Sequence, residues 1–239
     1  MSKAAMEAPW KAGARAVRDN ALPSLLILTA ATALVVSYYH VEVVKKYLDM
    51  LGQLNASGPR VFAAVMTAFS AGFIPWCVRM CFKKIRPAHP LLDLIHSTLW
   101  WAFMGLVVSS FYNLQSYFFG NEVSFSTVGK KVLLDQFAFS ILIGAPFNAI
   151  SHYWKDHQWS MAELGHALRP GWYRRLIVPN LLPNFLVWLP GNCIFYSMPP
   201  DLQLPVANCI GCFWALMCVR IATHSRAAGA IPHQSHPAA

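Results

Sequence analysis

Long apolar runs recur along the chain, separated by short segments that carry most of the charged residues. A bilayer core about 30 Å thick is crossed by a helix of roughly 20 mostly apolar residues. The runs have about that length and are hydrophobic nearly all round. They extend over Leu22–Tyr39, Val61–Phe82, Leu94–Phe119, Val132–Ile150, Ile177–Met198 and Leu202–Thr223. The pattern predicts about six membrane-spanning helices.

The pattern favours helices over strands. Backbone groups in lipid must be hydrogen-bonded within the protein, which a helix does within a single segment. A membrane β-barrel would show alternating stretches of about ten residues, and the sequence has no such stretches. We therefore expect an all-α fold, a multi-pass transmembrane helical bundle.

Composition agrees with a lipid environment. Apolar residues make up 56% of the 239 residues, and charged residues only 12%. That charged share is about half of what soluble domains carry. A water-soluble surface would need far more charge, so the bilayer itself is the first partner that we predict.

The net charge of +9 is distributed unevenly across the predicted spans. With the N-terminus placed inside, the outer side holds Lys45, Lys46, Arg60, Lys130 and Lys131, and the other fourteen basic residues lie inside. The positive-inside rule predicts this bias. Both termini are therefore expected on the same, basic side. No basic stripe alternates with aromatic residues, so nucleic-acid binding is excluded.

The sequence contains no recognisable catalytic, cofactor or metal motif. Cys77 and Cys81 lie four residues apart inside an apolar run, without a second pair that would complete a zinc site. The nine histidines form no H-E-x-x-H pattern, and no nucleophile elbow or Walker loop is present. We expect a protein that is not an enzyme and binds neither cofactor nor metal.

Polar residues inside the apolar runs are the informative positions. Asp135 and Gln136 open the fourth run, Asn184 and Asn192 lie in the fifth, and Asn208 lies in the sixth. Such residues are costly in lipid unless they face the bundle interior or water. They have two interpretations: hydrogen bonds between helices, or the wall of a hydrated pathway. Both require an inward polar face, and the sequence leaves both open.

Prolines are concentrated in the fifth run. Pro179, Pro183 and Pro190 each remove a backbone donor, and each can free a carbonyl four residues earlier. We expect them to interrupt this helix and to produce a kink, which would act as a gate or be static. In the fourth run, Lys131 lies one helical turn before Asp135 and is its nearest expected partner.

The segment 105–214 resembles the family of the peroxisomal membrane protein of 22 kDa and the mitochondrial inner-membrane Mpv protein. Residues 131–136, K-V-L-L-D-Q, match the family's K-x-x-x-D-Q, and residues 206–214, V-A-N-C-I-G-C-F-W, follow its last helix. The sequence departs from the family at Ile194, where the family has Asn, and at Gln203, where it has Arg.

The resemblance implies a small organellar membrane protein. Family members form weakly selective channels for small metabolites in the mitochondrial inner membrane and in peroxisomes. For this chain it implies a small-solute channel or transport pathway lined by the five polar residues above, with the mitochondrial inner membrane favoured over peroxisomal or other organellar membranes. The solutes would be small polar metabolites or ions. The alternative is a non-conducting structural or interaction protein, and a homo-oligomer is left open.

The resemblance also divides the chain into three parts. Residues 1–60 form a basic flank and an additional first transmembrane helix outside the family-like region. Residues 61–226 form the family-like bundle. The tail 227–239 is rich in Ala, Pro and His, and is expected to be disordered.

Overall fold

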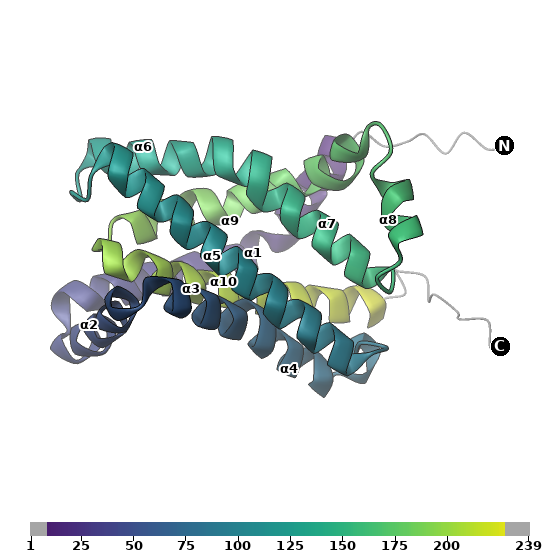
Figure 1. Ribbon diagram of the computed structural model, residues 1–239, viewed down its shortest axis with the longest axis horizontal. Coiled ribbons are helices and arrows are strands. Elements are labelled where there is room, and N and C mark those ends of the chain that lie inside the picture. The colour runs from purple at the N-terminus through teal and green to yellow at the C-terminus, as the bar shows by residue number, and fades with distance from the viewer. Residues whose placement is uncertain (1–8, 228–239) are drawn as a thin grey trace.

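The described structure is helical and, within the residues described, has no strand. The computed structural model describes the backbone of residues 9–227 and the side chains of residues 18, 21–83 and 85–216. Long helices run side by side along the long axis of the molecule (Figure 1). The predicted all-α fold is therefore confirmed. The tail predicted to be disordered lies outside the described residues, except for Ala227, the last residue of the final helix.

Six long helical segments alternate in direction across the described part of the bundle. They are α1 (Pro9–His40), then α3 (Pro59–Thr67) with η1 (Ala68–Phe73) and α4 (Ile74–Cys81), α5 (Pro90–Phe119), α6 (Phe125–Leu134) with η3 (Asp135–Gly144) and α7 (Ala145–Asp156), α9 (Val178–Tyr196) and α10 (Pro200–Ala227). Each of the six predicted apolar runs coincides with one of these segments.

Four of the six segments are long and apolar enough to cross a membrane. They are Ala21–His40, Pro59–Cys81, Pro90–Phe119 and Phe125–Asp156. The prediction of about six spans therefore exceeds what the described residues show. Three prolines and three asparagines make α9 less apolar, and the side chains of α10 are described only to Leu216. Both segments are helices, as expected, and their crossing of the membrane remains a prediction.

The connections contain helices that the apolar pattern did not indicate. The longest is α2 (Glu42–Ser57), and the others are η2 (Lys83–Ile85), α8 (Met161–Ala167) and η4 (Tyr173–Ile177). α2 packs against α10, where Asn55 Nδ2 donates to the Asp201 carbonyl at 2.9 Å. On its outer face, the hydrogen bond from Lys45 to Asp49 holds the pKa of that carboxyl below its usual value.

The molecule exposes large apolar side chains and buries polar ones. Val61, Leu99 and Leu142 are 70%, 66% and 69% exposed, whereas Gln115 and Gln136 are both 0% exposed. This is the reverse of a water-soluble surface, which is rich in charged residues. The distribution fits an integral membrane protein whose helices face lipid.

Glycines permit the closest helix contacts. A Cβ at Gly105 on α5 would overlap the Ala63 carbonyl oxygen on α3. A Cβ at Gly72 on η1 would lie 2.9 Å from the Ser97 carbonyl oxygen on α5. Small residues allow backbones to approach closely in membrane bundles. Both α3 and η1 therefore pack closely against α5.

Three π-helical segments each end two residues before a proline. η1 precedes Pro75, η3 precedes Pro146, and η4 precedes Pro179. Proline lacks an N–H and clashes with the carbonyl four residues earlier. A wider turn in front of it relieves both problems, because the π-helix bonds residues five apart. The prolines thus account for where the helices widen.

The three prolines of the fifth run lie in one continuous helical stretch. Pro179 follows the π-helix η4 directly, and the Val178 N–H bonds to the Tyr173 carbonyl, so the helix runs from η4 into α9. Pro183 and Pro190 lie inside α9, and the helix continues from Val178 to Tyr196. That these prolines produce a kink or a gate stays a prediction.

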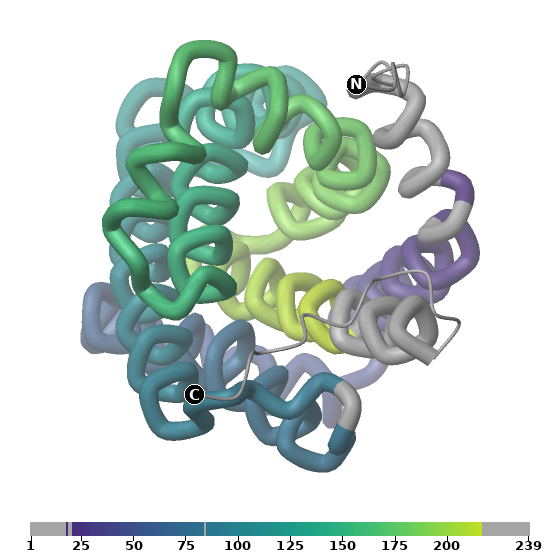
Figure 2. The backbone as a smooth tube through the Cα atoms, turned by 90° about the vertical axis from the view of Figure 1, so that its right-hand side faces the viewer, coloured from purple at the N-terminus to yellow at the C-terminus, as the bar shows by residue number. Residues whose placement is uncertain are grey.

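The bundle has two distinct ends. Figure 1 shows that α1 begins and α10 ends at the same end, which is also where α4 and α7 end. Figure 2 views the molecule from this end, with α10 lying between α1 and the α4–α5 pair. On which side of a membrane this end lies remains a prediction from the charge bias.

Candidate functional site

A buried polar cluster lies where η3 packs against α9. Asp135 and Gln136, the first two residues of η3, are 7% and 0% exposed, and Asn192 on α9 is 1% exposed. These side chains come from the polar positions that the sequence singled out. The folding of the chain brings them together although α9 begins more than forty residues after η3 starts.

The partner of Asp135 is a tyrosine. Tyr196 Oη donates to Asp135 Oδ2 at 2.7 Å, and the Asn192 side chain lies near the same carboxylate. The expected pairing with Lys131 is wrong, because Lys131 Nζ donates instead to Ser116 Oγ on α5 at 3.3 Å. A lysine one turn away on a helix pairs only if both side chains bend toward each other, and here the two point to different neighbours.

A second link joins the same two elements. Gln136 Nε2 donates to Asn184 Oδ1 at 3.4 Å, which is long for a hydrogen bond. Asn184 itself is half-buried. The η3–α9 interface therefore carries two polar contacts, one short and one weak.

Helix α5 contributes residues that sequence reasoning missed. The Tyr112 ring packs at 5.4 Å from the Tyr196 ring, and Gln115 Nε2 donates to the Lys131 carbonyl at 3.0 Å. Gln115 is a polar residue in an apolar run, so the rule that found Asn184 could also have found it. Tyrosine occurs throughout such runs, and the search for polar residues inside them singled out neither Tyr112 nor Tyr196. We call the whole set the inner polar cluster: Tyr112, Gln115, Asp135, Gln136, Asn184, Asn192 and Tyr196.

Several atoms of the inner polar cluster have no hydrogen-bond partner. They are Gln115 Oε1, Gln136 Oε1 and Asn192 Nδ2, all buried. Leaving such a group unpaired costs about 1–3 kcal/mol. Gln115 Oε1 and Gln136 Oε1 accept no hydrogen bond from the described residues, and Asn192 Nδ2 lies beside the Asp135 carboxylate without a hydrogen bond of standard geometry. The arrangement has spare hydrogen-bonding capacity for water or for a polar solute.

Asn208 lies at a different interface. Its Oδ1 accepts from Ser70 Oγ on η1 at 3.3 Å, and its Nδ2 has no partner. The structure thus brings together four of the five predicted pathway residues, and Asn208 faces η1 instead. An apolar hollow of about 320 Å³ lies nearby between α1 and α10, lined by Ala30, Ala31, Leu34, Val206, Cys209, Ile210 and Phe213.

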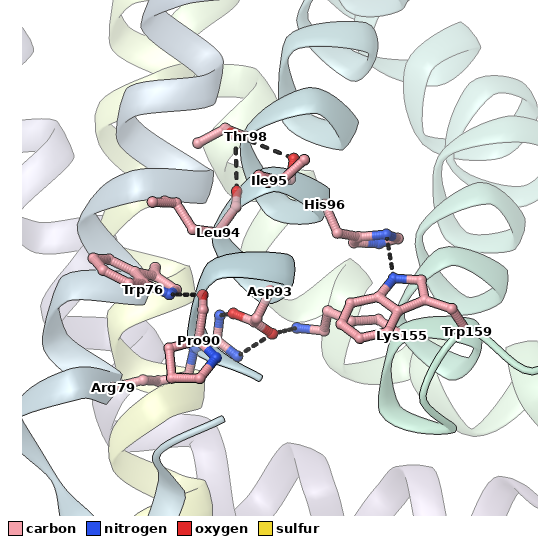
Figure 3. A network of polar contacts seen from close by, with 10 residues as sticks. All are labelled: Trp76, Arg79, Pro90, Asp93, Leu94, Ile95, His96, Thr98, Lys155 and Trp159. Carbon is pink, nitrogen blue, oxygen red and sulfur yellow. Dashed lines mark hydrogen bonds and ion pairs between the residues drawn. The ribbon is translucent and has the colours of Figure 1, made fainter. Parts of the chain in front are cut away.

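A second polar group occupies the end of the bundle where α4 and α7 end (Figure 3). Asp93, in the first turn of α5, accepts from Arg79 of α4 at 2.5 and 3.3 Å. Lys155 of α7 lies 3.3 Å from the same carboxylate. We call Arg79, Asp93 and Lys155 the terminal ion cluster. Lys155 follows Asp135 by twenty residues, roughly 30 Å of helix at 1.5 Å per residue.

Hydrogen bonds extend inward from the terminal ion cluster. His96 Nδ1 accepts from Trp159 Nε1 at 3.0 Å, and its Nε2 lies 2.9 Å from Ser151 Oγ. About one turn further along α5, Trp100 Nε1 donates to Asn148 Oδ1 at 3.1 Å. The sequence contained a signal for this region, since alternating spans place the end of the second run, the start of the third and the end of the fourth on one side.

Within the described residues, no group of three His, Cys, Asp or Glu side chains is arranged to hold a metal ion. Cys77 and Cys81 share a helix face, where Cys81 Sγ contacts the Cys77 carbonyl at 3.4 Å.

Comparisons with protein-family models, with curated proteins and with solved structures give no match for this chain. The family resemblance therefore rests on the sequence motifs alone, and the function must be argued from the site.

Proposed function

We propose that the protein provides a pathway for small polar solutes or ions across a membrane, between α5, η3 and α9. The observation that supports this most is the set of partnerless atoms in the inner polar cluster, Gln115 Oε1, Gln136 Oε1 and Asn192 Nδ2. Polar atoms buried in a membrane bundle are expensive unless water or a solute completes their hydrogen bonds. A hydrated pathway supplies both the water and the polar solute.

The chemistry of the cluster indicates what would pass. It offers one carboxylate, several amides and two phenols, and no cation among its seven members. Groups that line a pathway set its selectivity together with its diameter. A single carboxylate with neutral donors and acceptors favours small neutral polar solutes and cations, and discriminates weakly between them.

The arrangement described corresponds to a narrow form of this pathway. Asp135, Gln136 and Asn192 are packed against one another with little exposed surface. The elements around them are those in which a helix most easily rearranges: the π-helix η3, and α9 with its internal Pro183 and Pro190. Widening at the η3–α9 interface would break the Tyr196–Asp135 and Gln136–Asn184 hydrogen bonds and separate the Phe137 and Phe185 rings.

The membrane that we propose is organellar, with the mitochondrial inner membrane favoured. The support is the family resemblance of residues 105–214.

A second function is favoured by one observation. The hydrogen bonds from Tyr196 to Asp135 and from Gln136 to Asn184 join neighbouring helices, as packing contacts in a non-conducting protein would. In that case the cluster would only hold helices together, and the protein would act through its surface as a structural or interaction protein.

Flux through reconstituted liposomes separates the two functions. Purified protein is inserted into vesicles loaded with solutes of graded size and charge, and the release of each solute is compared with that from protein-free vesicles. The proposal expects release of small polar solutes, with cations ahead of anions of equal size. Vesicles that contain folded protein and retain every solute would contradict it and favour the non-conducting function.

A further inference from the structure

The terminal ion cluster has more positive than negative charge. Two cations, Arg79 and Lys155, contact one carboxylate, Asp93, so the three together carry a charge of +1. The side chains of Lys155 and Asp93 are only 8% and 6% exposed, and that of Arg79 is 20% exposed. Water therefore screens this charge weakly, and an uncompensated buried charge is costly.

The other carboxylate within electrostatic reach does not remove the imbalance. Asp156 interacts with His96 at longer range, but its side chain is exposed at the end of α7. Further cations extend from this end of the bundle, where Lys83 and Arg86 are exposed. The surroundings are thus positive from the interior to the surface.

The same place is rich in hydrogen-bond donors and poor in acceptors. Trp154 Nε1 is buried and has no partner, although the Trp154 ring packs edge-on against His96 at 5.8 Å. Together, Lys155 and Arg79 carry about eight N–H donors, more than the roughly four lone-pair sites of the Asp93 carboxylate can accept. An acceptor with several oxygens and a negative charge would satisfy them.

His152 shows that this region is open to a ligand. The ring of His152 packs against Trp101 on α5 at 6.4 Å and lies within electrostatic reach of Arg79, Asp93 and Lys155. Its side chain is nevertheless exposed. The His152 ring therefore lies beside the terminal ion cluster and reaches the surface of the bundle.

We propose that Arg79, Lys155, His152 and the Trp154 indole form a binding site for an oxyanion, a phosphate or carboxylate group. The anion would compensate the positive charge that Asp93 leaves over, and it would accept a hydrogen bond from Trp154 Nε1. Arginine and lysine are the residues that bind such groups. The site lies roughly 30 Å along the helix from Asp135, and its existence does not depend on whether the inner polar cluster conducts.

The site is tested by equilibrium binding of radiolabelled inorganic phosphate to the full-length protein in a phosphate-free detergent. Saturable binding is expected. Lys155→Gln should weaken it by about tenfold or more, since truncating one member of a buried charged pair costs at least that much. Trp154→Phe keeps an aromatic ring and removes the N–H, and should weaken binding by about fivefold, the value of one hydrogen bond.

Two further variants show whether the effect is specific. Lys83→Gln removes an exposed cation at the same end and should leave the affinity within about twofold, because exposed charges are screened by salt. Asp93→Asn removes the competing carboxylate and should strengthen phosphate binding, and phosphate should then raise the melting temperature of this variant more than that of the wild type. The proposal is wrong if phosphate does not bind saturably, or if Lys83→Gln weakens binding as much as Lys155→Gln does.

The oxyanion could belong to a lipid headgroup or to a soluble solute, and the bilayer distinguishes them. The same measurement is made in nanodiscs of phosphatidylcholine and in nanodiscs that contain phosphatidylglycerol. Phosphate binding that is kept in the first and lost in the second identifies a lipid headgroup as the occupant. Binding that is kept in both identifies a soluble anion. Absence of binding in both nanodiscs and in the detergent, with folded protein, overturns the site.

Discussion

Asp135 is a carboxylate held inside an apolar bundle by a phenol. Tyr196 Oη donates to it at 2.7 Å, and the nearest lysine on its own helix points elsewhere. An arginine or lysine in place of Tyr196 would neutralise the charge, whereas a phenol leaves it available. In the proposed pathway, Asp135 would therefore be the residue most able to act on a passing cation.

The first prediction concerns this carboxylate. Asp135→Asn keeps an oxygen that accepts from Tyr196, so the fold should persist, while cation preference and the pH dependence of flux should be lost because an amide does not titrate. Asp135→Leu leaves the Tyr196 hydroxyl unpaired and should cost about 1–3 kcal/mol of stability. Melting in detergent and flux at several pH values check both. Unchanged flux and pH profile in Asp135→Asn, with Asp135→Leu unfolded, would make Asp135 structural.

The second prediction concerns the two asparagines of α9. Asn192→Leu removes a buried Nδ2 that has no partner, and Asn184→Leu removes one weak contact. Interhelical hydrogen bonds in membranes average about 0.6 kcal/mol, so each melting temperature should change little. Solute flux should fall strongly, because leucine narrows and dries a pathway. A sharp loss of stability with intact flux per folded molecule would assign both residues to helix packing.

At the residue scale, the sequence identified four of the seven residues of the inner polar cluster. The energetic cost of Asp, Asn and Gln in lipid is large enough to single out Asp135, Gln136, Asn184 and Asn192 without a structure. The same rule predicts an inward position for Asn208 but cannot say which helix it meets. The phenols Tyr112 and Tyr196 were missed because tyrosine is common at membrane interfaces and carries no comparable penalty.

Helix α5 is positioned by its one glycine, Gly105. The contact of Gly105 with the backbone of α3 leaves no room for a side chain. This packing sets where Tyr112 and Gln115 stand, because both lie on α5 within three turns of Gly105. The helix that Gly105 holds close to α3 thus carries one wall of the inner polar cluster.

The third prediction follows from that packing. Gly105→Ala should destabilise the protein by about 1–3 kcal/mol, the usual cost of overpacking. Gly129 on α6 is the matched control, since a Cβ there has nothing within 4 Å. Gly129→Ala should be neutral or stabilise by about 0.5–1 kcal/mol, because glycine in a helix costs that much relative to alanine. Equal melting temperatures for the two variants would contradict the close contact.

At the element scale, apolar length predicted the long helices well, and it failed on the others. Leu94–Phe119 and Val61–Phe82 match α5 and the α3–η1–α4 segment within a few residues. The helix Glu42–Ser57 carries charges such as Lys45 and Asp49, so the search for apolar runs assigned it to a connection. The π-helices were also missed, although Pro75, Pro146 and Pro179 each mark the end of one.

At the scale of the whole molecule, the charge bias and the alternation of helices agree. α1 begins and α10 ends at the end of the bundle that carries Arg79 and Lys155 (Figure 1). Fourteen of the nineteen basic residues were assigned to that side from the sequence alone. Six helical segments return the chain to the end of the bundle at which α1 begins.

The fourth prediction is therefore that both termini lie on the same side of the membrane. Cysteines introduced by Ser2→Cys and Ala239→Cys, in a protein whose six native cysteines are replaced, should react alike with an impermeant thiol reagent in sealed vesicles. An internal control is Lys130→Cys, which the charge bias assigns to the opposite side. Opposite labelling of the two termini would mean an odd number of spans.

The central claim is that the inner polar cluster borders water in the working protein. In the same cysteine-free background, Gln136→Cys and Asn192→Cys are treated with a membrane-impermeant, positively charged methanethiosulfonate in proteoliposomes. Leu142→Cys, on the exposed face of the same π-helix as Gln136, is the matched control. The account predicts modification and block of flux at 136 and 192, and no modification at 142. The account is contradicted if positions 136 and 192 react no more than position 142 does, in vesicles whose protein is folded.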